Sequence, residues 1–427
     1  MRKMKDSGIA WIGEIPEGWG IHKIKHHFSI VSGATPKSEV PEFWDGNIPW
    51  ITPADYKTQD RYVAGGRKSL TKAGYDSCGT TLVPSGSIVF SKRAPVGTVA
   101  ISKNELCTNQ GCLSCVAKDN SDCVFYYFAM SAFTPEFELV STGTTFKEIS
   151  ADVFANFPMP TPSIDVQHMI ASFLDTQCAH IDAVIEKTQA SIEEYKKLKQ
   201  AVITQAVTKG IRPNRAMKDS GIEWIGDVPE EWSVRRIKTI FTLRDERNYL
   251  PLEEVNLISL YTDLGVVQHC DLEKTTGNKA SNADGYKKVY PNDIIVNIIL
   301  CWMGAIGRCD YTGVTSPAYD IYVPSDEIEC RFYHHYFRTR GFSGDCYKRG
   351  KGIMAMRWRT YSDQFMDIKV VVPPITEQKI ILKYLDDKCT ELDRLISKKE
   401  TLLSELESYK KSLIYEYVTG KKEVPAC

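Results

Sequence analysis

The stretch MKDSGIAWIGEIPEGW at residues 4–19 returns as MKDSGIEWIGDVPEEW at residues 217–232. The offset of 213 residues, from 4 to 217, is half of the 427-residue chain. Proteins built from short repeats have periods of roughly 20 to 50 residues. A period of more than 200 residues therefore indicates two copies of a whole domain.

The ends of the two halves also match. PSIDVQHMIASFLD at residues 162–175 aligns with PPITEQKIILKYLD at residues 373–386, an offset of 211 from 162 to 373. The roughly 130 residues between the matching ends differ between the halves. This pattern predicts a common frame that carries two different recognition modules.

Length and composition are those of a multidomain globular protein. A chain of this length can form two to four domains with their own cores. Its apolar and charged fractions are 43% and 25%. No apolar run reaches the roughly 18 residues that span a bilayer, and the N-terminus lacks a signal-peptide pattern. We expect a cytoplasmic protein that does not contact membranes.

The 13 cysteines are scattered and odd in number, which predicts free thiols. Cys107, Cys112, Cys115 and Cys123 include one Cys-x-x-Cys and could hold zinc, but no second pair follows at ligand spacing. We favour small buried side chains on strands and expect no metal.

The last part of each half has the pattern of a long helix. No glycine or proline occurs from Asp165 to Thr208, and the seam residues recur at spacings of three and four. The seam comprises Ile181, Ile185, Thr188, Ile192, Tyr195, Lys199 and Val202, and its copy comprises Leu392, Ile396, Lys399, Leu403, Leu406, Lys410 and Leu413. We predict N-caps at Ser163 and Thr376 and helix ends at Gly210 and Gly420.

The middle of each half predicts short strands and helices. Residues 86–90 and 96–101 are β-branched runs bounded by turn residues, and residues 293–297 and 304–307 repeat them loosely. Aromatic segments at 125–128 and 332–337 are predicted to be helices that pack on a sheet. The repeated segments at 4–19 and 217–232 contain glycine and proline and are predicted to be irregular.

These patterns predict an α+β protein in which two mixed α/β recognition domains are joined by two long helices. Each helix of about 40 residues would measure about 60 Å. A single helix would leave its apolar seam exposed, so we predict that the two copies pair within the chain. The result would be an antiparallel coiled coil with pseudo-two-fold symmetry. Dimerisation of the coiled coil with another chain is the alternative.

Four motifs resemble those of type I restriction–modification specificity subunits. They are the repeated Trp-Ile-Gly…Pro…Trp segment, SGATPK at 32–37 with FWDGNIPWITPAD at 43–55, TNQG at 108–111, and Pro-x-x-x-x-Gln at 162–167 and 373–378. They occur in this family's order and cover nearly the whole chain. The second half lacks the motif of residues 32–55 and has TSPAY at 315–319 where the first has TNQG, as expected if it reads a different half-site.

The resemblance implies two target-recognition domains, at residues 1–162 and 213–372, each reading one half of a split double-stranded DNA sequence. Helical spacers would occupy residues 163–212 and 373–427. The resemblance also implies assembly with two methyltransferase subunits and with restriction subunits. S-adenosylmethionine, ATP and Mg²⁺ would then lie on those partners, and this chain would carry no cofactor.

Motifs of catalysis are missing from the sequence. It has no Asn/Asp-Pro-Pro-aromatic methyltransferase motif, no phosphate-binding loop and no metallohydrolase histidine pair. We therefore expect a non-catalytic subunit. A self-contained DNA-modifying enzyme and a coiled-coil scaffold that binds no DNA are the two alternatives.

DNA contacts are expected from basic and amide side chains in the two middle regions. The net charge of −1 gives no support to non-specific DNA binding, so local clusters matter more. The largest cluster runs from Lys348 to Arg359 and contains no acidic residue. Each candidate could instead be a solvated surface charge. The candidates are Lys37, Lys92, Arg93, Asn109, Gln110 and Lys147 in the first half, and Arg244, Arg247, Arg308, Lys348, Arg349, Lys351, Arg357 and Arg359 in the second.

Trp11, Trp19, Trp224 and Trp232 recur in both halves and therefore belong to the shared frame. We predict either that they pack each recognition domain against the long helices or that they form a docking face for the methyltransferase subunits.

Overall fold

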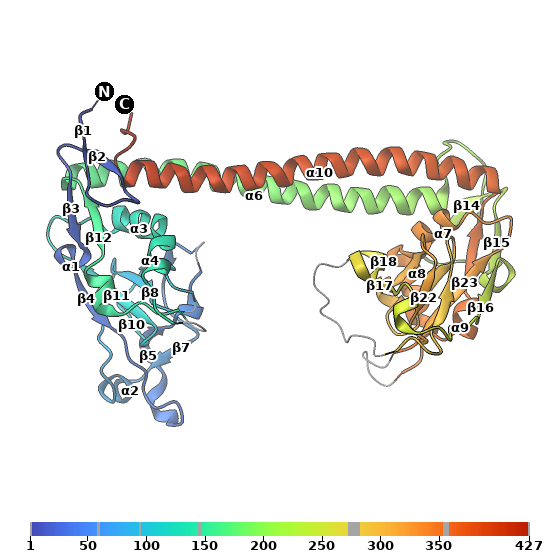
Figure 1. The fold of residues 1–427 in the computed structure, drawn as a ribbon, viewed down its shortest axis with the longest axis horizontal. Helices are drawn as coiled ribbons and strands as arrows, with labels where there is room; N and C mark the ends of the chain where they lie inside the picture. Colours follow the sequence, from blue (N-terminus) through green and yellow to red (C-terminus); the bar gives the residue numbers. More distant parts are fainter. Residues whose placement is uncertain are drawn as a thin grey trace. The chain divides into compact units, whose positions relative to one another are not determined.

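The computed structural model describes residues 2–57, 60–93, 95–143, 147–271, 282–352 and 358–425. The chain divides into two compact units. The first unit comprises residues 1–189 and 401–427, and the second comprises residues 190–400. Each unit contains a globular part and one segment of each of the long helices α6 (Ile164–Lys209) and α10 (Ile375–Val418) (Figure 1).

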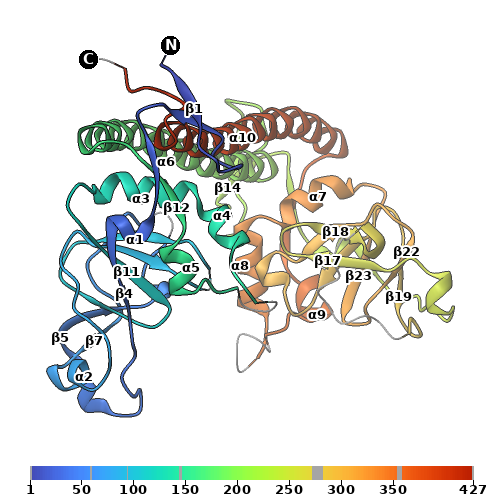
Figure 2. The same ribbon diagram turned by 60° about the vertical axis from the view of Figure 1, so that its left-hand side comes forward.

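The first unit is built on a five-stranded sheet. Helix α3 (Cys123–Ala132) lies between this sheet and the long helices (Figure 2). Phe90 of the sheet, Phe125 of α3 and Leu174 of α6 belong to one core, and all three are fully buried. The strand order is β4 (Phe28–Ser32), β11 (Cys112–Ala117), β8 (Ile88–Ser91), β9 (Val99–Ser102) and β6 (Tyr62–Val63).

Smaller elements complete the first unit. A three-stranded sheet has the order β10 (Cys107–Thr108), β5 (Trp44–Ile51) and β7 (Lys68–Leu70). Two antiparallel pairs join β1 (Met4–Asp6) to β2 (Glu14–Pro16) and β3 (Gly20–Lys23) to β12 (Pro158–Thr161). The short helices are α1 (Ile24–His27), α2 (Lys72–Asp76), α4 (Thr134–Leu139) and α5 (Ala151–Ala155).

The second unit repeats the central sheet of the first. Its order, β16 (Phe241–Arg244), β23 (Tyr319–Pro324), β20 (Ile294–Asn297) and β21 (Ile306–Arg308), matches β4–β11–β8–β9. Helix α7 (Cys330–Phe337) occupies the place of α3. The strands predicted at 86–90, 96–101, 293–297 and 304–307, and both aromatic helices, are therefore confirmed in substance.

The two sheets carry different additions. The second unit has the pairs β17 (Ile258–Tyr261) with β18 (Gly265–Gln268) and β19 (Lys287–Val289) with β22 (Gly313–Thr315). Its shared frame contributes β13 (Met217–Asp219) with β14 (Asp227–Pro229) and β15 (Ser233–Arg236) with β24 (Lys369–Val372). Its other helices are α8 (Arg340–Arg349) and α9 (Ser362–Met366).

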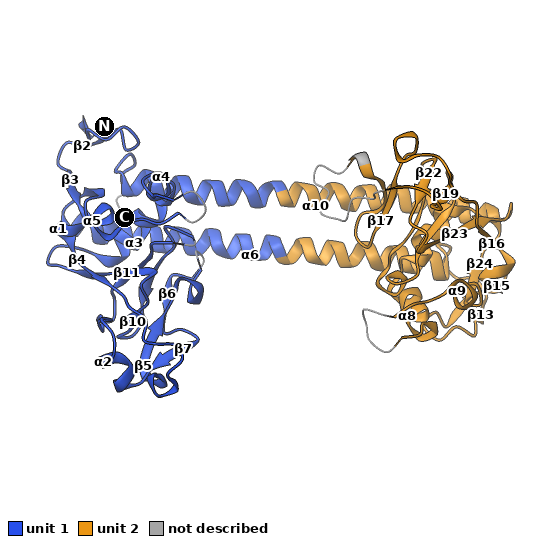
Figure 3. Cartoon of the chain, turned by 60° about the horizontal axis from the view of Figure 1, so that its bottom comes forward, with its two compact units in different colours: residues 1–189, 401–427 blue, residues 190–400 orange. Residues whose placement is uncertain are grey.

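Within each unit the segments of α6 and α10 run antiparallel (Figure 3). In the first unit the rings of Phe173 and Tyr417 lie 4.6 Å apart, and Asp182, further along α6, pairs with Lys410, further back along α10. In the second unit Lys199 pairs with Asp393. The predicted seam is buried at Ile181, Thr188, Ile192, Leu392, Ile396 and Leu413. The prediction of an antiparallel pair within one chain is confirmed.

The helix ends agree with the sequence at three of four positions. Ser163 directly precedes α6, and Gly210 and Gly420 follow the last helical turns with φ of 73° and 70°. Thr376 is not an N-cap, because it is the second residue of α10. The offset of 211 places Pro374 opposite Ser163, and a proline fits there because residues at a helix start need no N–H donor.

The glutamine of each Pro-x-x-x-x-Gln motif joins a long helix to its globular part. Gln167 is buried, accepts a hydrogen bond from the backbone N–H of Asp122 at 2.9 Å and donates one to the carbonyl of Pro162 at 2.9 Å. Gln378 does the same with Glu329 and Pro373, each at 2.8 Å. Because Asp122 and Glu329 are the N-caps of α3 and α7, the motif fixes these helices on α6 and α10.

The repeated opening segments are more regular than predicted, because each forms a two-stranded antiparallel ladder. Gly13 and Gly226 both have a φ of 67°, which lets the chain turn back between the strands. Trp19 belongs to the same buried core as Tyr417 and Val418 of α10, and Trp232 belongs to the same buried core as Ala206 and Val207 of α6. These tryptophans therefore pack each globular part against the end of a long helix, the first of the two predicted roles.

Two further sequence predictions concern the cysteines and membrane-spanning segments. Cys107, Cys112 and Cys115 are free and buried on β10 and β11, as predicted. Burial raises the pKa of the Cys112 thiol to about 12. Cys123 differs from the prediction, because it is half-buried and lies on helix α3. No helix in the described ranges is long and apolar enough to cross a bilayer.

Candidate DNA interface

Three motif segments of the first unit meet at one place. Strand β10 pairs with β5 in parallel, so Cys107 lies beside Trp50. The backbone N–H of Ala34 donates to Thr108 O at 3.0 Å, and that of Asn109 donates to Ile51 O at 2.9 Å. Gly33 lies so close that a Cβ atom there would be 2.2 Å from Thr108 O. TNQG, which lies more than 50 residues further along the chain, is therefore a spatial neighbour of SGATPK and WDGNIPW.

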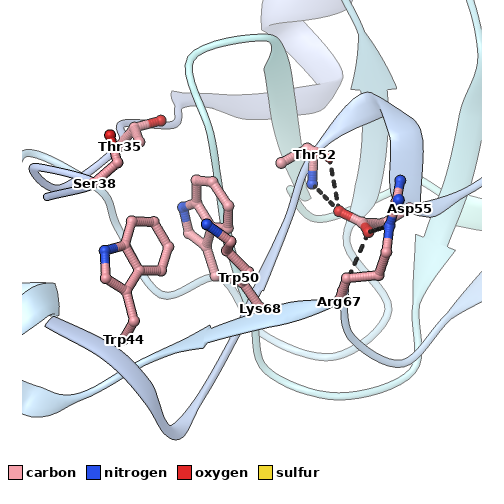
Figure 4. Close-up of a pocket in the computed structure, with 8 residues that line it drawn as sticks. All are labelled: Thr35, Ser38, Trp44, Trp50, Thr52, Asp55, Arg67 and Lys68. Carbon is pink, nitrogen blue, oxygen red and sulfur yellow. Dashed lines mark hydrogen bonds and ion pairs between the residues drawn. The ribbon is translucent and has the colours of Figure 1, made fainter. Parts of the chain in front are cut away.

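A pocket of about 330 Å³ opens where these segments meet (Figure 4). The indole rings of Trp44 and Trp50 lie 5.2 Å apart at 77°, edge to face. Trp44 Nε1 donates to Lys37 O at 3.3 Å and Trp50 Nε1 donates to Ala34 O at 3.0 Å, so both rings are fixed under the 34–38 loop. The pocket is lined by Thr35, Ser38, Trp44, Trp50, Thr52, Asp55, Arg67 and Lys68.

Asp55 is the one acidic residue of this lining, and both of its carboxylate oxygens already accept hydrogen bonds. Its Oδ2 accepts from the N–H of Thr52 at 2.8 Å and from the Thr52 hydroxyl at 2.7 Å, and its Oδ1 accepts from Arg67 N at 3.1 Å. Arg67 Nε also donates to Oδ1, at 3.3 Å. Burial raises the pKa of the Asp55 carboxyl, but the hydrogen bonds from Thr52 and Arg67 outweigh burial, so its pKa lies below the usual range. The carboxylate therefore positions Arg67.

None of the predicted contacts of the first half lines this pocket, but two of them lie next to a lining residue or bond to one. Lys37 is exposed on the 34–38 loop. The Thr35 hydroxyl donates to Gln110 Oε1, and Asn109 Oδ1 accepts from Gly111 N at 2.9 Å, which shapes the turn. Gly111 O in turn accepts from the backbone N–H of Lys92 at 2.9 Å.

The remaining first-half candidates, Lys92, Arg93 and Lys147, lie around Glu148. Lys92 Nζ lies 2.9 Å from Glu148 Oε1, and Arg93 Nη1 lies 3.9 Å from Glu148 Oε2. Lys147 is exposed beside Glu148 in the chain. All six first-half candidates thus belong to one connected region of the first unit.

Three candidates of the second half are held by partners of their own unit. Arg244 makes two 3.1 Å bonds to the carboxylate of Asp293, which is buried. Arg247 bonds to Asp245 at 2.5 Å and to Gly285 O at 3.2 Å. Arg308 bonds to Asn292 at 2.8 Å and to Asp310. Each of these arginines therefore has a structural role.

Two basic residues of the cluster from 348 to 359 pair with acidic residues from other parts of the chain. Lys348 pairs with Glu223 at 2.8 Å and Arg349 with Asp367 at 3.6 Å. Lys351 and Arg359 face each other through backbone hydrogen bonds of 2.8 and 3.0 Å. Their exposed side chains have no carboxylate partner among the residues that the structure describes. Arg357 lies outside the described residues.

Sequence reasoning missed the aromatic side chains of both regions. Trp44, Trp50 and Lys68 line the first-unit pocket. In the second unit the ring of Trp358 stacks on Tyr347 at 4.9 Å and 22° beside the basic cluster. A sequence signal was available only for Trp358, which lies between Arg357 and Arg359, since stacking on aromatic side chains and cationic contacts occur together in nucleic-acid sites.

Comparisons with known proteins agree with these motifs. The family described as "Type I restriction modification DNA specificity domain" matches residues 16–194. The MjaIX specificity subunit of Methanocaldococcus jannaschii is 34% identical over 190 residues, which are 44% of this chain and 43% of that protein. The alignment therefore spans less than half the length of that relative.

Two other similarities extend over nearly the whole chain. The MjaVIII specificity subunit of the same organism is 20% identical over 96% of this chain and 94% of its own. A solved structure from work on complex assembly of the type I R-M system has a TM-score of 0.73 at 12% identity. The structural alignment covers 96% of this chain and 99% of that one. The two chains therefore share a fold. Residues 16–194 therefore match the type I restriction modification DNA specificity domain, and nearly the whole chain is similar to a type I specificity subunit.

Proposed function

We propose that this chain is the non-catalytic specificity subunit of a type I restriction–modification enzyme and that each of its units reads one half of a bipartite DNA target. The main support is that the motif at 108–111 meets the motifs at 32–37 and 44–50, and that six basic or amide candidates belong to the same region of the first unit. The second unit has the same sheet but different added strands. One frame with two different surfaces suits a target made of two unlike half-sites.

The proposal includes partners. Two methyltransferase subunits would bind the chain, and restriction subunits would join them, in keeping with the type I R-M system named for the solved structure. S-adenosylmethionine, ATP and Mg²⁺ would lie on these subunits, and the assembly would work in the cytoplasm on cellular DNA. The burial of Trp19 and Trp232 means that docking would use other residues of the frame.

The test is to produce the chain with its methyltransferase subunit in a host free of adenine methylation and to sequence the genomic DNA by a methylation-aware method. We expect methylation at one motif with two specific parts and a fixed gap, and none when this chain is omitted. A continuous motif would contradict two separate readers. Methyl transfer by the purified chain alone would favour the self-contained enzyme, and a complex that binds no DNA would favour the scaffold.

A further inference from the structure

The pocket beneath the 34–38 loop has the chemistry of a nucleotide site. Its floor is two indole rings, which stack with any nucleobase. Trp44 and Trp50 are 9% and 5% exposed, and both belong to the lining of the pocket. Both indole N–H groups are already bonded to the loop, so the rings offer a ligand an apolar surface without a free donor.

The rim of the pocket is positive. Lys68 Nζ lies 4.7 Å from the centre of the Trp44 ring, where it takes the place that a cationic ligand would occupy. The described residues include no carboxylate partner for Lys68. Arg67 is 78% exposed, and Asp55 has no accepting position left for a ligand. Cationic ligands are therefore disfavoured, and an anion can approach Lys68, Arg67 and the exposed Lys37.

We infer that this pocket binds a single nucleotide, with the base against Trp44 and Trp50 and the phosphate at Lys68 and Arg67. If the nucleotide is part of the bound DNA, it is one that has left the base stack of the duplex, and in this case the inference rests on the proposed function. A free nucleotide presents the same base and phosphate. The second half lacks the Trp-Asp-Gly stretch, so only the half-site read by the first unit would use such a pocket.

The first experiment uses the complete complex with its methyltransferase subunits. A duplex carries 5-iodouracil in a one-nucleotide bulge within the half-site read by the first unit, and photo-crosslinks are mapped by mass spectrometry. We expect a crosslink to Trp44 or Trp50. Ser38→Leu should reduce it at least tenfold because the new side chain closes the rim. Glu39→Leu, at the next exposed position outside the pocket lining, should leave the crosslink unchanged.

Charge is tested separately. Lys68→Gln should weaken binding of the bulged duplex and reduce its salt slope by about one. Lys72→Gln is the matched control, because Lys72 lies on α2 and is paired with Asp76. In parallel, adenosine monophosphate is titrated calorimetrically into the wild-type and Ser38→Leu complexes to detect the free-nucleotide source.

The outcomes separate the two proposals. A crosslink in the pocket supports the DNA source, and binding of adenosine monophosphate that Ser38→Leu abolishes supports the free source. If the complex binds the duplex, crosslinks only elsewhere and does not bind adenosine monophosphate, the pocket inference is overturned and the proposed function stands. If the wild-type complex binds no DNA, the proposed function fails, and the calorimetric titration alone decides the pocket.

Discussion

The carboxylate of Asp182 accepts two hydrogen bonds from Lys410, at 2.6 and 2.7 Å. Adding 211 to 182 gives Asp393, and subtracting 211 from 410 gives Lys199, and these residues form the same pair at 2.7 and 2.6 Å. An antiparallel pair of repeated helices can make the same contact twice with the partners exchanged, and this ion pair is an example. The repeat in the sequence therefore sets the register of the helices in both units.

Each of these two ion pairs is expected to contribute little to the free energy of unfolding, and the two contributions should be independent of each other. Lys410 and Asp182 are 28% and 55% exposed, and pairs of this kind are worth about 0.2–1 kcal/mol. A double-mutant cycle of Asp182→Ala and Lys410→Ala, measured by urea unfolding, should give a coupling energy in that range. The cycle at Lys199 and Asp393 should give a similar value. A coupling energy well above this range would show that the pairs direct the register.

Gln378 should matter far more. Its side chain is buried and bonds to Glu329 N, Pro373 O and Glu327 O at 2.8, 2.8 and 3.1 Å. Gln378→Ala leaves these groups without partners, so urea unfolding should show a loss of about 2–4 kcal/mol. Gln200→Ala, at an exposed position of α6, should change stability by less than about 0.5 kcal/mol. Equal effects of the two substitutions would contradict this role of the motif.

The repeated frame could be predicted because identical residues made it visible. The heptad spacing located the seam residues, and glycines 210 and 420 located the helix ends. Thr376 was misplaced because a threonine before an acidic residue is a common N-cap pattern, whereas the helix already begins one residue earlier, at Ile375. The pocket was missed because Lys68, on β7, meets Trp44 only through the pairing of β7 with β5. Glu223 and Asp367, which pair with Lys348 and Arg349, come from other parts of the chain.

Stability of the second unit should depend on pH through Glu377. Burial raises the pKa of this carboxyl, but hydrogen bonds from Arg215 and Trp232 outweigh burial and lower the pKa below its usual range. A carboxyl with a lowered folded-state pKa stabilises the protein above its unfolded-state pKa, about 4.3, and loses this contribution as the pH falls through the folded-state value.

Glu377→Gln should therefore cost about 1–3 kcal/mol at pH 7. The difference in free energy of unfolding between the variant and the wild type should become smaller when urea unfolding is repeated at lower pH, down to pH 3. Glu391→Gln, at an exposed residue of the same helix, is the control and should show a nearly constant small difference. A gap that stays the same at all pH values would mean that the charge of Glu377 is not responsible.

The basic cluster should act through phosphates. Replacing Lys348, Arg349, Lys351, Arg357 and Arg359 with Ala should weaken DNA binding by the assembled complex and flatten its salt dependence, by roughly 0.9 in log–log slope per lost phosphate contact. Lys351 and Arg359, which lack carboxylate partners in the described part of the chain, should account for most of the change. Arg394→Ala with Lys398→Ala on α10 is the control. Unchanged affinity in a folded five-residue variant would contradict the assignment.

The long helices should set the gap between the two half-sites. Inserting one heptad after Ile192 and one after Leu403 keeps both seams in register and lengthens each helix by about 10 Å. At about 3.4 Å per base pair this is roughly three base pairs. The gap mapped by methylation-aware sequencing should grow by that amount while both half-site sequences stay the same. Three-residue insertions at the same points rotate the seam away from its partner and should mainly impair folding, which circular dichroism detects. A heptad variant that folds, binds and keeps the original gap would show that the helices do not set the spacing.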